Sequence, residues 1–248
     1  MTSRMLTPWW QARTASVNTS AGSTAATRIL DWNSVPVLKL MADLEPAIDP
    51  LTRLRSAHGL IAARVRPVYA VDDQQPVSET LTRRRGSCSQ RLAVLEAVAR
   101  AMRVATRCRG LLVDGRFWYP RFPRLRHLVP TEVLLAWPEF HLDSQWISTT
   151  ELFGSVEQLG GSGGGFTNSG GETLFDAVAR TAVDWDGASS TPGACSACDL
   201  SAAVLADLGH FDSRDQLFAT HGQTMCWGAR TLTAPVLNRW TAGHPQRA

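Results

Sequence analysis

Lysine and long apolar runs are almost absent from this chain of 248 residues. Lys39 is the only lysine among 25 basic residues, so arginine supplies nearly all of the positive charge. No apolar run approaches the ~18–20 residues that a bilayer-spanning helix needs, which excludes an integral helical membrane protein. The first twenty residues also lack the continuous apolar stretch of a secretory signal, so we expect a cytoplasmic protein.

The composition is that of a globular chain with an uneven distribution of charge. Hydrophobic residues make up 44% of the sequence and charged residues 19%, which argues against disorder. The net charge is only +3, too balanced to indicate a nucleic-acid partner. Residues 81–127, however, hold twelve arginines against Glu96 and Asp114, a local excess of +10.

The five cysteines point to reduced thiols and not to a disulfide framework. Their number is odd and no secretory signal precedes them. Cys195 and Cys198 have the spacing of half a zinc site or of a redox pair, but no second such pair and no matching histidine pair follows. We therefore predict neither a metal site nor a cofactor.

Apolar periodicity predicts an α+β fold. Helices are expected after Asp49-Pro50 as far as Val65, and over 172–183, 200–208 and 214–220, while residues 132–142 and 145–148 are expected to form a strand hairpin. The predicted parts are an N-terminal arm (1–44), a core (45–159), a glycine-rich loop (160–171) and a helical extension packed on the core (172–248).

Cys88 is the candidate nucleophile. It follows Gly86 and opens the amphipathic segment 92–102, with Ser87 or Ser89 available as the helix cap. At a helix N-terminus, unpaired N–H groups and the helix dipole favour the thiolate, which is the nucleophilic form of cysteine.

The segment from Pro76 to Val113 resembles the cysteine region of the transglutaminase-like superfamily, relatives of papain-like cysteine proteases. The resemblance rests on Gly86, on Cys88 at the start of a helix of small and apolar residues, and on the strand near 108–113. It implies a cysteine-bearing helix packed on an antiparallel sheet. It also implies a triad in which a histidine deprotonates the cysteine and an aspartate orients the imidazole.

The second half of the family pattern departs from this expectation. Residues 136–146, AWPEFHLDSQW, match the family hairpin, and that alignment puts Leu135 at the histidine position and Thr150 at the aspartate position. Neither side chain performs the family role. Two alternatives remain open: a shifted register that uses His127 and Asp143, or His127 folding back toward Cys88 while Leu135 keeps its place.

Other polar and aromatic residues are candidates for binding substrate. His141 lies about 20 Å along the strand from Leu135 at ~3.3 Å per residue, so we interpret it as a partly exposed strand residue. Substrate-binding candidates come from the aromatic run, the hairpin and the arginine-rich stretch (Trp118, Arg121, Trp137 and Arg91).

Two functions follow from these features. The first is a transglutaminase-like enzyme that uses Cys88 and His127 for acyl transfer, or for forming or cleaving an amide bond, in a biosynthetic pathway. Its expected partner is an anionic small molecule or a carrier-bound acyl group, with no membrane partner. The second is a family member without the triad that serves as a binding or scaffold module, or runs non-nucleophilic chemistry such as cyclisation. The oligomeric state stays open.

Overall fold

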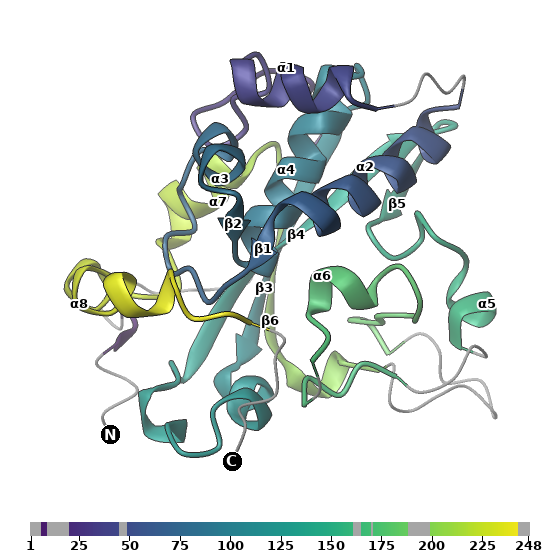
Figure 1. Cartoon of the computed structure of the whole chain (residues 1–248). Helices are drawn as coiled ribbons and strands as arrows, with labels where there is room; N and C mark the ends of the chain where they lie inside the picture. The colour runs from purple at the N-terminus through teal and green to yellow at the C-terminus, as the bar shows by residue number, and fades with distance from the viewer. Residues whose placement is uncertain are drawn as a thin grey trace.

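The computed structural model describes residues 6–8, 20–44, 49–160, 165–169, 171–187 and 199–242 (Figure 1). Its centre is a four-stranded antiparallel sheet with the strand order β5-β4-β3-β6. The sheet consists of β3 (Thr106–Asp114), β4 (Glu132–Leu142), β5 (Gln145–Ser148) and β6 (Val204–Phe211). A two-residue parallel pair, β1 (Arg66–Pro67) and β2 (Arg85–Gly86), lies just before the cysteine helix. Together with the helices, the sheet confirms the predicted α+β class.

Helices surround this sheet and one of them forms the middle of the core. The helices are α1 (Val35–Ala42), α2 (Pro50–Arg64), α3 (Val77–Arg83), α4 (Cys88–Ala101), α5 (Val156–Gly160), α6 (Leu174–Ala177), α7 (Arg214–His221) and α8 (Trp227–Leu237). Helix α4 is buried along nearly its whole length because it contacts β3 and β4 on one side and α1, α2 and α3 on the other. Figure 1 shows α1 and α2 lying across α4.

Several local predictions are confirmed by the structure. Asp49 caps α2, with its carboxylate accepting hydrogen bonds from the N–H groups of Leu51 and Thr52. Ser213 caps α7 by accepting the Gln216 N–H, as its sequence spacing predicts. The hairpin strands β4 and β5 have the predicted bounds.

The C-terminal extension is not wholly helical, which corrects the sequence prediction. Residues 204–208, predicted as the second half of a helix over 200–208, lie instead in strand β6, which pairs with β3. The helix predicted over 172–183 is reduced to the four residues of α6. Ala203, Leu205 and Ala206 are residue types that favour helices. Pairing of 204–211 with β3, however, provides hydrogen-bond partners for the backbone N–H and C=O groups at the edge of β3, and this tertiary hydrogen bonding overrides the local propensity.

The free edge of β4 is covered by side chains. Strand β5 pairs with β4 only from Glu139 to Leu142, which leaves the earlier part of β4 without a strand on that side. Thr224 Oγ1 accepts the Leu134 N–H at 3.1 Å, and Arg214 donates to the Ala136 carbonyl at 3.2 Å.

Within the described ranges, no helix is long and apolar enough to cross a membrane.

Candidate active site

Cys88 is the first residue of α4, held there by a reciprocal cap. Ser87 Oγ accepts the Gln90 N–H at 3.2 Å, and Gln90 Oε1 accepts the Ser87 N–H at 3.1 Å. Gly86 permits the tight approach that this cap needs, because a Cβ there would lie 2.9 Å from Thr80 Cγ2. The N–H groups of Cys88 and Ser89 occupy the first turn, where the helix itself offers no acceptor.

Cys88 opens onto a cavity of about 460 Å³. Apolar and aromatic side chains make up most of its wall, supplied by the chain just after β1, the turn at 115–130, β4 and α8. The volume lies within the range of ordinary small-molecule sites. The cavity therefore places a partly exposed thiol beside space that suits an apolar ligand.

Tyr69 and Arg121 form a polar group on the cavity wall. Arg121 hydrogen-bonds the Tyr69 hydroxyl and also donates from Nε to Asn168 Oδ1 at 2.8 Å. Burial raises the pKa of Tyr69, so its hydroxyl stays protonated at neutral pH. Tyr69 and Cys88 line the same cavity. The arrangement offers hydrogen-bond donors and one fixed cation near the thiol.

Asp73 is the acidic side chain on the same wall. Its N–H donates to Gln223 Oε1 at 2.9 Å, and its carboxylate accepts the Thr224 N–H at 3.4 Å. Gln90 Nε2 donates to the Asp72 carbonyl at 2.8 Å, which ties this loop to the first turn of α4. Desolvation by the surrounding protein raises the pKa of Asp73 to about 6. Asp73 is therefore ionised at neutral pH and able to accept a proton.

The structure brings the position predicted for the family histidine to the cavity. Leu135 lies on β4 opposite Leu111 of β3, and its side chain lines the same cavity as Cys88. Thr150, at the predicted aspartate position, is buried, and its hydroxyl has no hydrogen-bond partner in the described structure. The isobutyl side chain of Leu135 accepts no proton, so this position of the cavity wall supplies no general base.

The predicted site residues divide into those that reach the cavity and those that do not. Cys88, Trp118 and Arg121 line it. His127 is exposed in the short 3₁₀ turn Arg126–Leu128 and lies outside the set of lining residues. The pairing of Cys88 with His127 stays a prediction that the cavity lining does not support.

Trp137 and Arg91 also lie outside the cavity lining, because both are enclosed by protein. Trp137 is 2% exposed and packs edge-on against Trp185, with ring centroids 5.6 Å apart. Arg91 is 1% exposed, pairs with Asp176 at 2.9 Å and lies over the Phe175 ring at 4.1 Å. Their environment is that of core residues that join α4 and β4 to the segment around α6.

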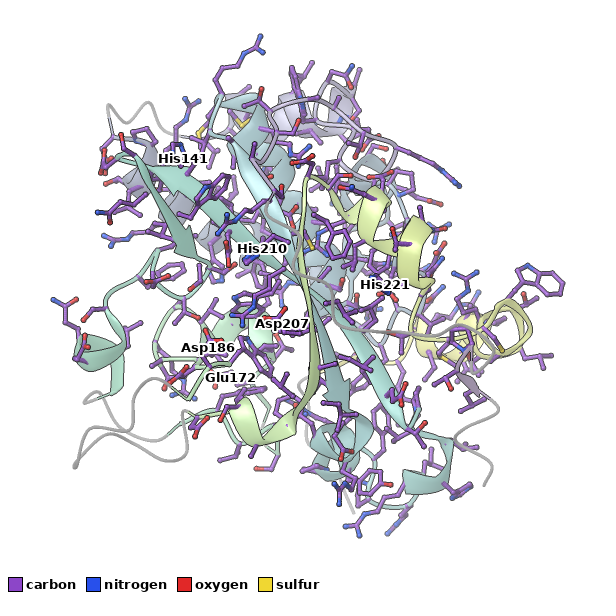
Figure 2. All side chains as sticks on the ribbon, turned by 180° about the vertical axis from the view of Figure 1, so that it is seen from behind. His141, Glu172, Asp186, Asp207, His210 and His221 are labelled. Carbon is purple, nitrogen blue, oxygen red and sulfur yellow. The ribbon has the colours of Figure 1, made fainter. Side chains whose placement is uncertain are left out.

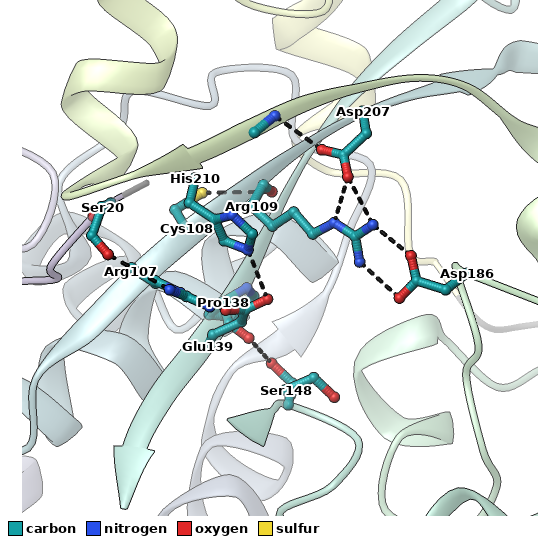
Figure 3. A network of polar contacts seen from close by, with 12 residues as sticks. Ser20, Arg107, Cys108, Arg109, Pro138, Glu139, Ser148, Asp186, Asp207 and His210 are labelled. Carbon is teal, nitrogen blue, oxygen red and sulfur yellow. Dashed lines mark hydrogen bonds and ion pairs between the residues drawn. The ribbon is translucent and has the colours of Figure 1, made fainter. Parts of the chain in front are cut away.

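Five of the twelve arginines in 81–127 form ion pairs in the described structure, with acidic residues elsewhere in the chain or nearby (Arg83, Arg91, Arg107, Arg109 and Arg116). Figure 3 shows Arg109 between Asp186 and Asp207, and Arg107 bound to Glu139, which also contacts His210. Figure 2 shows Asp186, Asp207 and His210 near one another on the rear of the molecule. Of the twelve arginines in 81–127, all of them described, only Arg121 lines the cavity. The excess of positive charge in 81–127 is therefore not concentrated at the cavity.

The other described thiols have different surroundings from Cys88. Cys108 is fully buried in β3, and burial strongly raises its pKa. Cys226 is partly exposed at the N-cap of α8. Cys195 and Cys198, and residues 161–164 and 170 of the glycine-rich loop, lie outside the described residues. Among the residues that are described, no cluster of three metal-ligating side chains occurs.

Sequence reasoning missed Tyr69 and Asp73. Both lie in the chain between β1 and α3, in a stretch without helical or strand periodicity that offered no local signal for a site. The only indication is an acidic pair, Asp72-Asp73, shortly before the cysteine segment. They line the same cavity as Cys88, and the Gln90 side chain and the β1–β2 pair, both tertiary contacts, hold this part of the chain near the start of α4.

Comparisons with known proteins add no evidence about the function of this chain. No family model and no curated protein matches the chain. One solved structure, of a candidate cysteine protease from Cytophaga hutchinsonii, aligns at 16% identity with a TM-score of 0.36. That alignment covers 58% of this chain and 46% of the other, so the match spans less than half of that protein. The site is therefore argued from its own geometry.

Proposed function

We propose that this protein is a cysteine enzyme that transfers or hydrolyses an acyl group, with Cys88 as the nucleophile. The observation that carries the proposal is the position of the Cys88 thiol at the N-terminus of α4, open to an apolar cavity of about 460 Å³. A buried structural cysteine, such as Cys108, has no such opening. The apolar wall favours a donor whose acyl group is a hydrocarbon chain or ring.

The proposed reaction has two steps. Asp73 takes the thiol proton, the sulfur attacks the acyl carbonyl carbon, and the bond to the leaving group breaks as the proton passes to it. An amine or water then attacks the thioester, loses a proton to Asp73, and the thiol is restored. The N–H groups of Cys88 and Ser89 stabilise the negative charge on the carbonyl oxygen.

The single cation of the cavity sets the expected polarity of the donor. Arg121 is held by Asn168 and by the Glu172 carbonyl, so its charge stays fixed at the wall. A guanidinium in this setting suits one carboxylate or phosphate on the donor, as in a carrier-bound or coenzyme-linked thioester. A donor with an apolar acyl group and one anionic end is a narrower form of the anionic small molecule or carrier-bound acyl group expected from the sequence.

The test is acylation of the intact protein. We expect incubation with acyl thioesters of N-acetylcysteamine to add the mass of one acyl group, in amounts that rise from acetyl to octanoyl. Cys88→Ala removes the adduct and Cys226→Ala keeps it, since Cys226 is the other partly exposed described thiol. Equal acylation of wild type and Cys88→Ala refutes the proposal.

Leu135 favours a second candidate function, a binding module without nucleophilic chemistry. None of the described cavity-lining residues is a histidine, and Leu135 fills the position predicted for it. If this candidate is correct, acyl ligands raise the melting temperature of wild type and Cys88→Ala equally and no covalent adduct forms. Leu135→His provides a matched gain-of-function test, because it places an imidazole on the wall beside Cys88.

A further inference from the structure

Helix α8 presents apolar side chains to solvent. Trp227, Leu232 and Val236 are 75%, 81% and 64% exposed, and no residue of the helix is buried. The exposed positions recur at the spacing of one helix face (Trp227, Gly228, Thr231, Leu232, Pro235 and Val236). A surface helix ordinarily turns such a face toward the core. Figure 1 shows α8 at the outer edge of the molecule, away from α1 and α2.

The exposed face of α8 is continuous with the interior of the cavity. Leu232 and Val236 are exposed and also line the cavity, so they form its rim. Leu128, 51% exposed, belongs to the same rim but comes from the turn before β4. An apolar surface therefore runs without interruption from solvent to the space beside Cys88.

Two segments that supply much of the rim are positively charged, while exposed Asp72 lies 3.7 Å from Arg230 of α8. Residues 115–131 and 216–242 include neither aspartate nor glutamate. Arg124, Arg126 and Arg239 are exposed, and each is within two positions of a residue that lines the cavity. Apolar side chains bordered by cations are complementary to an anionic surface with an apolar layer beneath it.

We propose that the rim surface, made of the exposed face of α8 with Leu128, Arg124, Arg126 and Arg239, binds the surface of an anionic phospholipid bilayer. The apolar side chains enter the layer below the headgroups and the arginines contact lipid phosphates. This attachment needs no spanning segment, so it departs from the sequence expectation of no membrane partner, which rested on the lack of a long apolar run. Combined with the proposed function, it lets an acyl chain pass from lipid to cavity without crossing water.

An acidic protein would meet the same cations, but it explains the apolar face less well. Protein–protein interfaces bury apolar residues in shaped, packed contacts surrounded by a polar rim. Here the exposed apolar side chains follow one face of a helix from its first residue and lead into an apolar cavity. Lipid chains match both features.

The test is co-sedimentation of the full chain with vesicles. We expect binding to vesicles of phosphatidylcholine mixed with phosphatidylglycerol, weaker binding to phosphatidylcholine alone, and loss of binding as salt rises. The double variant Leu232→Ser/Val236→Ser is expected to bind vesicles at least about tenfold more weakly, because it loses two inserted side chains. Val35→Ser/Leu38→Ser, which removes exposed apolar side chains from α1, binds as wild type does.

The outcomes separate this proposal from the proposed function. Cys88→Ala binds vesicles as wild type does, so failure of the acyl chemistry leaves the result unchanged. Wild type that does not sediment with anionic vesicles overturns the proposal, and so does an equal loss in the α8 and α1 variants. Retention on an immobilised acidic protein without vesicle binding also overturns it and assigns the surface to a protein partner.

Discussion

Asp73 supplies a prediction whose size follows from its surroundings. Its pKa rises from 3.8 to about 6 in the folded protein, so the fold holds the proton more tightly than the unfolded chain does. Ionisation of Asp73 therefore destabilises the fold as the pH rises through about 6, and the full penalty applies above pH 7. Well below pH 3.8 the carboxyl group is protonated in both states, and the penalty disappears.

The shift sets the magnitude expected for Asp73→Asn. A rise from 3.8 to about 6 corresponds to at most about 3 kcal/mol of unfolding free energy. Because Asp73 is only partly buried and faces the cavity, solvent screening reduces this to about 1–2 kcal/mol. For a chain of this length that is a gain of about 2–8 °C in melting temperature at pH 8.

The assay is thermal unfolding of wild type and Asp73→Asn from pH 8 to pH 4. We expect the variant to be more stable at pH 8 and the difference to close toward pH 4. Asp43→Asn is the control, since it removes the same charge from an exposed ion pair with Arg64. A difference that is constant across the pH range, or a variant less stable at pH 8, refutes the reasoning. Loss of acyl transfer in the stabilised variant would connect Asp73 to catalysis.

Three further predictions test the surroundings of the site. Arg214→Ala should lower the unfolding free energy by about 3–5 kcal/mol in urea, because it leaves buried Glu96 without its partner at 2.5 Å; a loss below 1 kcal/mol contradicts this. Gly86→Ala should lower the unfolding free energy by about 1–3 kcal/mol, since its Cβ would crowd Thr80. An unchanged melting temperature would contradict this and show that the cap at Ser87 adjusts to the extra methyl group. Iodoacetamide should label Cys88 in the native protein and leave buried Cys108 unmodified until denaturant is added, as read by peptide mapping. If Cys108 is labelled before Cys88, the assignment of Cys88 as the nucleophile is wrong.

The predictions that depend on the sequence near each element are the ones that the structure confirms. Asp49, Ser87 and Ser213 cap their helices through bonds to residues two or three positions ahead, so the sequence contains both partners. The hairpin of β4 and β5 is set by a two-residue turn and by alternating side chains. The position of Cys88 at the start of α4 is likewise determined by contacts between residues that are close in the sequence.

Only the tertiary structure decided the rest of the site. The strand character of 204–211 depends on the edge of β3, nearly a hundred residues earlier. Arg107 and Arg109 form ion pairs because Glu139, Asp186 and Asp207 fold against them, and charge counting along the chain does not show this. Asp73 gained its raised pKa from the protein packed around it. Hydrogen bonds within one turn of the chain are encoded locally, whereas burial and charge pairing depend on which distant segments meet.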